Sequence, residues 1–222
     1  MQYRHEWKHQ ISALDAHILR RQLQPIMKQD PHAPNGSYSI RSLYFDDSAD
    51  TALREKLDGI SCRGKFRIRF YNLDPGFIHL EKKIKHAGLG TKESVCLTSR
   101  QVEDILAGDI QWMANDPSDL MRELYCKMQQ GLRPKTVVDY TREPFIYAPG
   151  NVRVTLDHSI RTGLGSVALF DAALPTIAVP DDPIILEVKW DNFLPEIIQN
   201  IVQLGSRHAA AFSKYAACRS YD

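Results

Sequence analysis

The stretch GKFRIRFYNLD, residues 64–74, alternates strictly between two kinds of side chain. The polar set is Lys65, Arg67, Arg69 and Tyr71, and the apolar set between them is Phe66, Ile68 and Phe70. Because successive side chains of a β-strand point to opposite faces, this stretch predicts a strand with one apolar face and one cationic face. From this stretch alone, a solvated sheet face and an anion-binding surface explain the pattern equally well.

Short segments of the same kind run through the whole chain. They predict strands at 3–9, 38–45, 64–73, 77–86, 91–97, 136–143, 152–158 and 184–190. The sequence DPG at 74–76 favours a turn that joins two of these strands as a hairpin. Residues 163–183 have the least regular pattern and are interpreted as a loop within one domain and not as a domain boundary. A single domain is therefore expected over 1–222.

Four segments carry helical start and stop residues. Ser12 with Asp15 three residues later predicts a helix from 12 to 27, and Thr98 with Gly108 predicts one between them. The third is expected to begin at Asp116, with Pro117 in its first turn and Gly131 at its end, and the fourth covers about 195–219 with a break near Gly205. Many strands and few helices, not in strict alternation, predict an antiparallel α+β fold.

The polar faces of the predicted strands are strongly cationic. They carry ten cations: Arg4, Lys8, Lys65, Arg67, Arg69, Lys83, Lys85, Arg142, Arg153 and Lys189. They carry four anions: Glu6, Glu81, Asp157 and Glu187. This excess of six contrasts with a net charge of +1 for the whole chain. An ordinary solvated sheet face does not separate charge to this degree.

The segregated face predicts a tunnel. If the sheet closes into an eight-stranded barrel with its apolar faces outward under helices, the charged faces line a bore that holds one slender ligand. Confined cations repel one another, so a linear polyanion such as a nucleoside triphosphate, inorganic triphosphate or polyphosphate would satisfy them. The few carboxylates among the cations are suited to hold Mg²⁺ or Mn²⁺.

Other function classes lack support in the sequence. The charged start MQYRHEWKHQ has no signal-peptide core, and no apolar run approaches the roughly 20 residues that span a bilayer, so a cytoplasmic protein is expected. The four cysteines lack metal-ligand spacing and predict free thiols. The GxG in HAGLGTKES lacks P-loop spacing, and no aromatic platform for nucleic acid is evident.

Taken in order, several segments resemble the VTC domain, the polyphosphate-polymerase branch of the triphosphate tunnel metalloenzymes. They are RHEWKH, SLYFDD, EKLDG with RGKFRIRFY, LEKKIK, YTREPF, RVTLD, LEVKWDNFLP and FSKYAACR, and they extend over nearly the whole chain. The resemblance implies an eight-stranded antiparallel tunnel that binds triphosphate or polyphosphate with a divalent cation. It also implies transfer of the γ-phosphoryl group of ATP onto a growing polyphosphate chain.

The resemblance also implies roles for individual residues. Catalytic roles in holding the triphosphate and metal fall to Arg67, Arg69, Lys83, Arg142, Arg153 and Glu187. Further substrate contacts fall to Lys8, Lys56, Lys92, Tyr140, Lys189, Ser213 and Lys214. The metal would be held by Glu187, with Glu6 or Glu81. Each role has an alternative. The glutamates could be salt-bridge partners that balance neighbouring cations without binding metal. Lys65 and Lys85 could point to solvent, and Lys214 could be an exposed helix lysine.

One departure affects the expected chemistry. Hydrolytic and cyclase relatives begin with an ExExK pattern, whereas this chain has Arg4, Glu6 and Lys8. Loss of the first glutamate weakens a second metal site for activating water and favours phosphoryl transfer or binding over hydrolysis. Three classes therefore stay open: a polymerase that uses ATP and polyphosphate, a tunnel hydrolase, and a non-catalytic binder. A separate membrane protein is a candidate partner.

Overall fold

The computed structural model describes residues 4–33, 35–203 and 212–221, and it has an α+β fold. Eight long strands form its body: β1 (His5–Ile11), β3 (Tyr38–Asp46), β4 (Cys62–Tyr71), β5 (Asp74–His86), β6 (Leu89–Leu97), β7 (Arg133–Tyr147), β8 (Val152–Thr162) and β10 (Ile184–Trp190). The α-helices are α1 (Ala13–Leu23), α2 (Thr51–Leu57), α3 (Ser99–Ala107), α4 (Asp119–Gln129), α5 (Glu196–Val202) and α6 (Lys214–Cys218). Short elements complete the description: β2 (Lys28–Gln29), β9 (Ile177–Ala178), and the 3₁₀ turns η1 (Gln111–Asn115), η2 (Pro149–Asn151) and η3 (Arg219–Tyr221).

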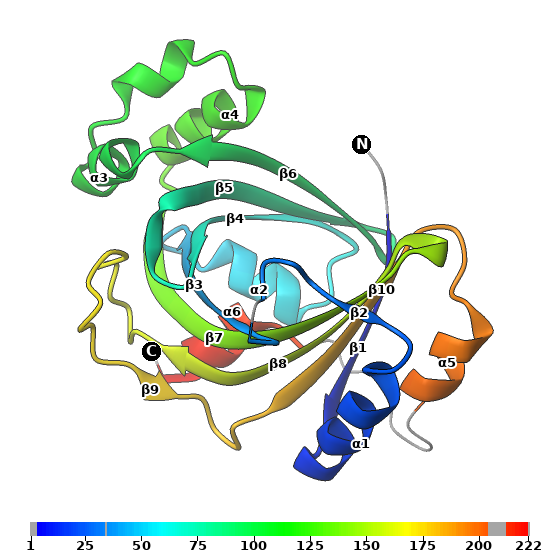
Figure 1. Cartoon of the computed structure of the whole chain (residues 1–222). Helices are drawn as coiled ribbons and strands as arrows, with labels where there is room; N and C mark the ends of the chain where they lie inside the picture. Colours follow the sequence, from blue (N-terminus) through cyan, green and yellow to red (C-terminus); the bar gives the residue numbers. More distant parts are fainter. Residues whose placement is uncertain (1–3, 34, 204–211, 222) are drawn as a thin grey trace.

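The strands form one antiparallel sheet that curls into a tunnel (Figure 1). Its order is β1-β10-β8-β7-β3-β4-β5-β6, with β2 and β9 added to β7 and β8. The two edge strands approach each other through a pair of backbone hydrogen bonds between Arg4 and Gly90, of 3.0 and 3.2 Å. The α+β tunnel expected from the sequence is confirmed, although within the described residues one bridge, and not a full ladder, joins its edges.

The hairpin between β4 and β5 differs from the expectation. The predicted turn at 74–76 is wrong, because Asp74 already pairs with Tyr71 as the first residue of β5. The turn consists of Asn72 and Leu73, whose φ angles of 52° and 55° are left-handed. Two such residues match the twist of the flanking strands, so they make the tighter connection.

Helix ends follow the capping residues in two of the predicted cases. Ser12 and Thr98 each form a capping box, and Gly108 ends α3 with a φ of 83°. The helix expected from Asp116 instead begins at Asp119 with Ser118 as its N-cap, because the Asp116 carboxylate accepts a hydrogen bond from the Ser118 N–H at 2.8 Å. Helix α2 was not predicted from the sequence. The expected strand start at residue 3 and the break near Gly205 lie outside the described residues.

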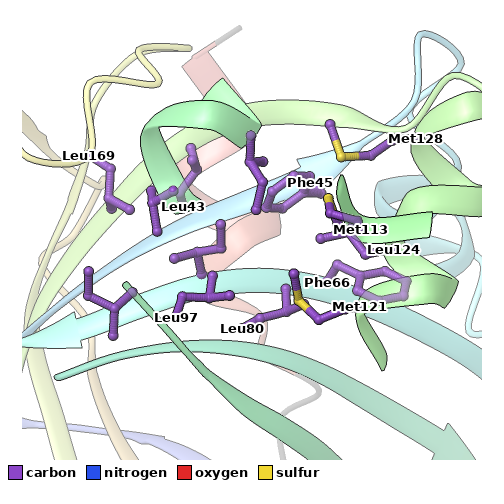
Figure 2. Close-up of a cluster of buried hydrophobic side chains, with 14 of the residues drawn as sticks. Leu43, Phe45, Phe66, Leu80, Leu97, Met113, Met121, Leu124, Met128 and Leu169 are labelled. Atoms are coloured by element: carbon purple, nitrogen blue, oxygen red, sulfur yellow. The ribbon is translucent and has the colours of Figure 1, made fainter. Parts of the chain in front are cut away.

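The apolar faces of the strands point outward and pack beneath the helices. One buried cluster joins Leu43, Phe66 and Leu80 of the sheet to Met121 and Leu124 of α4 (Figure 2). A second buried cluster lies between α1, α5 and strands β1, β8 and β10. Because these two clusters lie outside the sheet, much of the inner face is left to polar side chains. A third buried cluster, which includes Ile40, Tyr44, Val138 and Tyr140, packs with Tyr215 of α6 on the inner side. Among the described residues, none of the helices combines the length and hydrophobicity that crossing a bilayer requires.

Candidate functional site

The inner face of the curled sheet encloses a cavity of about 650 Å³. Its lining includes fourteen cations: Arg4, Lys8, Lys56, Arg63, Lys65, Arg67, Arg69, Lys83, Lys85, Lys92, Arg142, Arg153, Lys189 and Lys214. The carboxylates in the described lining are Glu6, Glu81 and Glu187. Among these residues the cavity therefore has an excess of eleven positive charges, whereas the whole chain has a net charge of +1. Such a cavity attracts anions.

Every side chain that the sequence predicted for the site lines this cavity, including Ser213 and Lys214 of the C-terminal region. Lys65 and Lys85, for which the alternative was that they point to solvent, also line this cavity and are partly exposed. Arg63 was missed, although it continues the alternation of Lys65 and Arg67 by one further step, because the strand was expected to start too late. The tyrosines Tyr38 and Tyr44 of β3 were also missed.

Glu6 and Glu187 form a carboxylate pair on neighbouring strands. In the register of β1 and β10, Glu6 is opposite Lys189 and Lys8 is opposite Glu187, so the two carboxylates are diagonal neighbours that contact each other. Their side chains are each 4% exposed. Lys83 lies 2.8 Å from Glu6, and Lys8 lies 3.5 and 3.8 Å from Glu6 and Glu187.

This pair has the donor chemistry of a divalent-cation site. Glu6 Oε2 is buried and has no hydrogen-bond partner among the described residues, although Lys85 lies 3.6 Å from it, so this oxygen can still accept a hard cation. Burial raises the pKa of Glu187, but Lys189 and Lys8 more than offset this effect and hold the pKa well below its ordinary value. Glu187 is therefore ionised at neutral pH, as metal binding requires.

Glu81 lies in a different environment. It accepts hydrogen bonds from Arg67 at 2.6 and 2.8 Å and from Lys92 at 2.7 Å, and Arg69 is 3.7 Å away. Burial raises its pKa, but Arg67 and Arg69 lower it far more strongly. In the part of the chain that the structure describes, no three histidine, cysteine or acidic side chains converge as a metal cluster. The geometry therefore assigns Glu81 to orienting Arg67, apart from the Glu6–Glu187 pair.

Arg142 and Lys214 meet at a buried carboxylate, Asp157. Asp157 is fully buried and accepts hydrogen bonds from Arg142 at 2.6 and 2.7 Å and from Lys214 at 2.5 Å. The Lys214 ammonium lies 4.4 Å from the centre of the Tyr140 ring. Burial raises the pKa of Asp157, but Arg142 and Lys214 hold it well below its ordinary value. This carboxylate fixes two cations that come from β7 and α6.

Helix α6 is held against the tunnel by tyrosine contacts. The Tyr215 hydroxyl donates a hydrogen bond to Asp46 at 2.6 Å, and its ring stacks on Tyr44 with centroids 5.1 Å apart. The Tyr44 hydroxyl in turn accepts a hydrogen bond from Arg67 at 3.2 Å. These contacts link the position of Lys214 to the cations of β4.

Arg4, which departs from the ExExK pattern, forms an ion pair with Asp191. Its Nε is 2.6 Å from Asp191 Oδ1, and its Nη2 donates to the backbone carbonyl of Asn151 at 2.5 Å. The position at which the pattern has a carboxylate therefore carries a positive charge in this chain. This arrangement adds no third acidic group to Glu6 and Glu187.

Polyanion binding is expected to take up protons near pH 8. Burial and then Arg63, Lys56, Lys8 and Arg67 lower the pKa of Lys65 to about 8. A bound anion would raise this pKa, so Lys65 should gain a proton on binding and affinity should fall as the pH rises above 8. Titration calorimetry with tripolyphosphate in two buffers of different ionisation heat measures the uptake.

Lys65→Gln should remove part of this uptake, and the exposed Lys127→Gln should not change it. Equal uptake in both variants would contradict the assignment. The stability of the free protein has the opposite pH dependence to ligand affinity. Between pH 8 and the ordinary lysine pKa the unfolded chain holds more protons at Lys65, so this residue makes the free energy of unfolding rise with pH.

A curled antiparallel sheet whose inner face is lined by cations and a carboxylate pair defines a protein of the triphosphate tunnel class. The sequence profile of the VTC domain matches residues 3–221, and the chain belongs to this family. The comparison with curated proteins found no match for the chain.

Two solved structures share the fold. A candidate adenylate cyclase from Bacillus halodurans is 16% identical, with a TM-score of 0.54 over 91% of this chain and 89% of that chain. HpAC1 from Hippeastrum, an adenylyl cyclase candidate described as having a dominant triphosphatase activity, is 14% identical, with a TM-score of 0.56 over 100% and 96%. At these identities the likeness concerns the fold alone.

Proposed function

We propose that the chain is a metal-dependent phosphotransferase that moves the γ-phosphoryl group of ATP onto a growing inorganic polyphosphate chain. The observation that carries this proposal is the charge of the tunnel, where fourteen cations from strands and helices face three carboxylates within the described lining. A linear chain with a negative charge on every unit satisfies cations that are spread along a bore. A single phosphate would satisfy few of them.

Arginines and lysines hold the triphosphate in this mechanism. Arg67, Arg69 and Arg142 present planar guanidinium groups that bind phosphate oxygens in pairs, while Lys83 and Lys214 supply point charges. Glu81 and Asp157 fix the orientation of Arg67 and Arg142 before the substrate arrives. Fixed cations around the transferred group stabilise the charge of the transition state without reorganisation.

Glu187 and Glu6 would hold Mg²⁺ or Mn²⁺, and the ion would supply neutralisation of phosphate charge. A terminal oxygen of the acceptor chain attacks the γ-phosphorus, the bond to the β–γ bridging oxygen breaks, and ADP leaves with that oxygen. The attacking oxygen is already ionised at neutral pH, so this step requires no general base. The residues of the tunnel position the two reactants in line.

Triphosphate hydrolysis is the second candidate. The retained Glu6–Glu187 pair favours it, as does the fold shared with HpAC1 and its described triphosphatase activity. Against it, Arg4 stands where the hydrolytic pattern has a glutamate, and it forms an ion pair with Asp191. Phosphoryl transfer therefore fits this chain better than activation of water at a second metal.

One assay separates the candidates. The purified chain is incubated with ATP and Mn²⁺ and the products are resolved into ADP, free phosphate and long-chain polymer. We expect one molecule of ADP for each phosphate unit added to the polymer. Free phosphate without polymer would support the hydrolase, and tight polyanion binding without turnover would support a non-catalytic binder. Matched reactions with EDTA test the metal requirement.

A further inference from the structure

Buried polar atoms without hydrogen-bond partners gather on one wall of the tunnel. Among the described residues they include Glu6 Oε2 on β1, and Arg153 Nε and Thr155 Oγ1 on β8. Strand β10, which carries Glu187, lies between these two strands and pairs with both. Folded proteins rarely leave buried polar atoms unpaired, so this wall indicates groups that are satisfied only when a ligand is bound. Glu6 and Arg153 have proposed roles in holding the metal ion and the triphosphate, whereas Thr155 has none.

Thr155 is directly opposite Glu187 in the pairing of β8 with β10. Side chains in this relation have Cβ atoms about 4.5–5.5 Å apart, so rotation of the side chains can bring a hydroxyl and a carboxylate together. On the other side of Thr155, the pairing with β7 places Pro144, which has no polar side chain. Asp157, the next residue on the same face of β8, already accepts hydrogen bonds from Arg142 at both oxygens. Glu187 is therefore the carboxylate best placed to pair with Thr155.

Burial keeps Thr155 out of the cavity itself. Thr155 is 2% exposed and is outside the described cavity lining, which includes Glu187. A phosphate chain in the tunnel would therefore contact Glu187 and not the threonine hydroxyl. Carboxylates that bind metal ions are usually hydrogen-bonded by groups that do not touch the metal, and these groups fix the orientation of the carboxylate.

In the free protein, cations surround the Glu187 carboxylate. Arg142 is 3.3 Å and Lys8 is 3.8 Å from it, and Lys189 forms a third ion pair with it. Phosphates compete for the same N–H groups, so substrate would draw these cations away from Glu187. The carboxylate would then need a neutral donor beside the metal ion. The Thr155 hydroxyl has no other partner among the described residues and can donate this hydrogen bond.

We infer that Thr155 is a positioning residue for Glu187, and that its hydroxyl donates a hydrogen bond to this carboxylate when a divalent cation and phosphates are bound. This inference rests on the metal role that the proposed function gives to Glu187. A hydroxyl carries no charge, so it orients the carboxylate without competing with the metal ion as a cation does. Thr155 touches neither the substrate nor the metal, and it acts through Glu187 alone.

The test measures how Mn²⁺ changes the binding of tripolyphosphate. Tripolyphosphate is titrated by calorimetry into the wild type, Thr155→Val and Thr155→Ser, once with Mn²⁺ and once with EDTA. The ratio of the affinity in Mn²⁺ to that in EDTA should fall about tenfold in Thr155→Val and by less than about threefold in Thr155→Ser. The affinity in EDTA should stay within about threefold of the wild type in both variants. Without ligand, Thr155→Val should melt no lower than the wild type, because valine removes a buried hydroxyl without a partner among the described residues.

Thr136→Val is the matched control. Thr136 is also buried in the sheet, but its hydroxyl accepts a hydrogen bond from the Gly165 N–H at 3.2 Å. This variant should melt lower than the wild type and keep the wild-type affinity ratio. In a Glu187→Gln background, Thr155→Val should change the ratio by less than about twofold, because the carboxylate that it positions has been removed.

An unchanged affinity ratio in Thr155→Val would overturn the inference. An equal loss of affinity in Mn²⁺ and in EDTA would also overturn it, because the hydroxyl would then contact phosphate. So would a Thr155→Ser protein that binds as Thr155→Val does, or a lower melting temperature of ligand-free Thr155→Val. If the ATP assay yields no polymer while the ratio depends on Thr155, the proposed function fails and the positioning role stands.

Discussion

Changing Glu187 to glutamine is expected to lower the rate of polyphosphate formation from ATP by about 10³-fold. The amide keeps the size of the side chain but removes the negative charge that would hold the metal ion beside Glu6. Lys8, Lys189 and Arg142 all lie within 3.8 Å of this carboxylate, so its removal adds unbalanced positive charge to the tunnel. Binding of tripolyphosphate without metal should therefore be as tight as in the wild type or tighter.

The opposite responses of turnover and metal-free binding separate a metal role from a structural role. They are measured by product analysis with Mn²⁺ and by calorimetry in EDTA. Glu103→Gln is the control, because Glu103 is exposed on α3 and outside the cavity lining. A Glu187→Gln protein with wild-type turnover and unchanged metal dependence would contradict the role given to Glu187. Loss of both turnover and metal-free tripolyphosphate binding, together with a lowered melting temperature, would identify Glu187 as a structural residue instead.

The tunnel was predictable because its determinants are local. Alternation in GKFRIRFY fixes which side chains share a face, and strands with one cationic face can bury an apolar face only beneath helices. The structure confirms this for Phe66 and Ile68, which pack in the outer core while Lys65 and Arg67 line the cavity. Membership of a strand face therefore predicted most of the lining without any knowledge of pairing.

Partner choice inside the tunnel was not predictable, because it depends on strand register. The strand pattern offers Glu6, Glu81 and Glu187 as equivalent carboxylates, and only the family resemblance singled out Glu187. Only the pairing of β1 with β10 brings Glu6 to Glu187, and only the pairing of β4 with β5 sets Glu81 opposite Arg67. The hairpin turn was mispredicted for a related reason. The turn is made by Asn72 and Leu73, which both adopt left-handed backbone angles. The DPG sequence that follows them is a stronger turn signal and therefore predicted the turn in the wrong place.

Helix α2 was missed because the side chain of its N-cap residue, Asp50, does not cap it, and a carboxylate four residues earlier does so instead. The Asp46 carboxylate at the end of β3 accepts hydrogen bonds from the N–H groups of Ala52 and Leu53 at 2.8 and 3.1 Å. This contact satisfies the first turn of a helix of seven residues, TALREKL, which is too short to be stable alone. Asp46 also accepts from Tyr215, so one carboxylate fixes both helices that bring Lys56 and Lys214 to the tunnel.

Changing Asp157 to asparagine is expected to destabilise the protein by about 3–5 kcal/mol, because it leaves Arg142 and Lys214 buried without their carboxylate. For a chain of this length the melting temperature should fall by roughly 10 °C. The depressed pKa of Asp157 also means that its contribution is present at neutral pH and is lost as the pH falls through its folded-state pKa. Thermal melts of both proteins at pH 7 measure the difference.

A polyanion should partly reverse this loss, because phosphates can take the place of the missing charge beside Arg142 and Lys214. Saturating tripolyphosphate should therefore raise the melting temperature of Asp157→Asn by more than it raises that of the wild type. Asp109→Asn, an exposed residue outside the cavity lining, should behave as the wild type in both conditions. Equal shifts in all three proteins would show that the ligand does not reach these two cations. A variant as stable as the wild type without ligand would show that Asp157 is not needed to hold them.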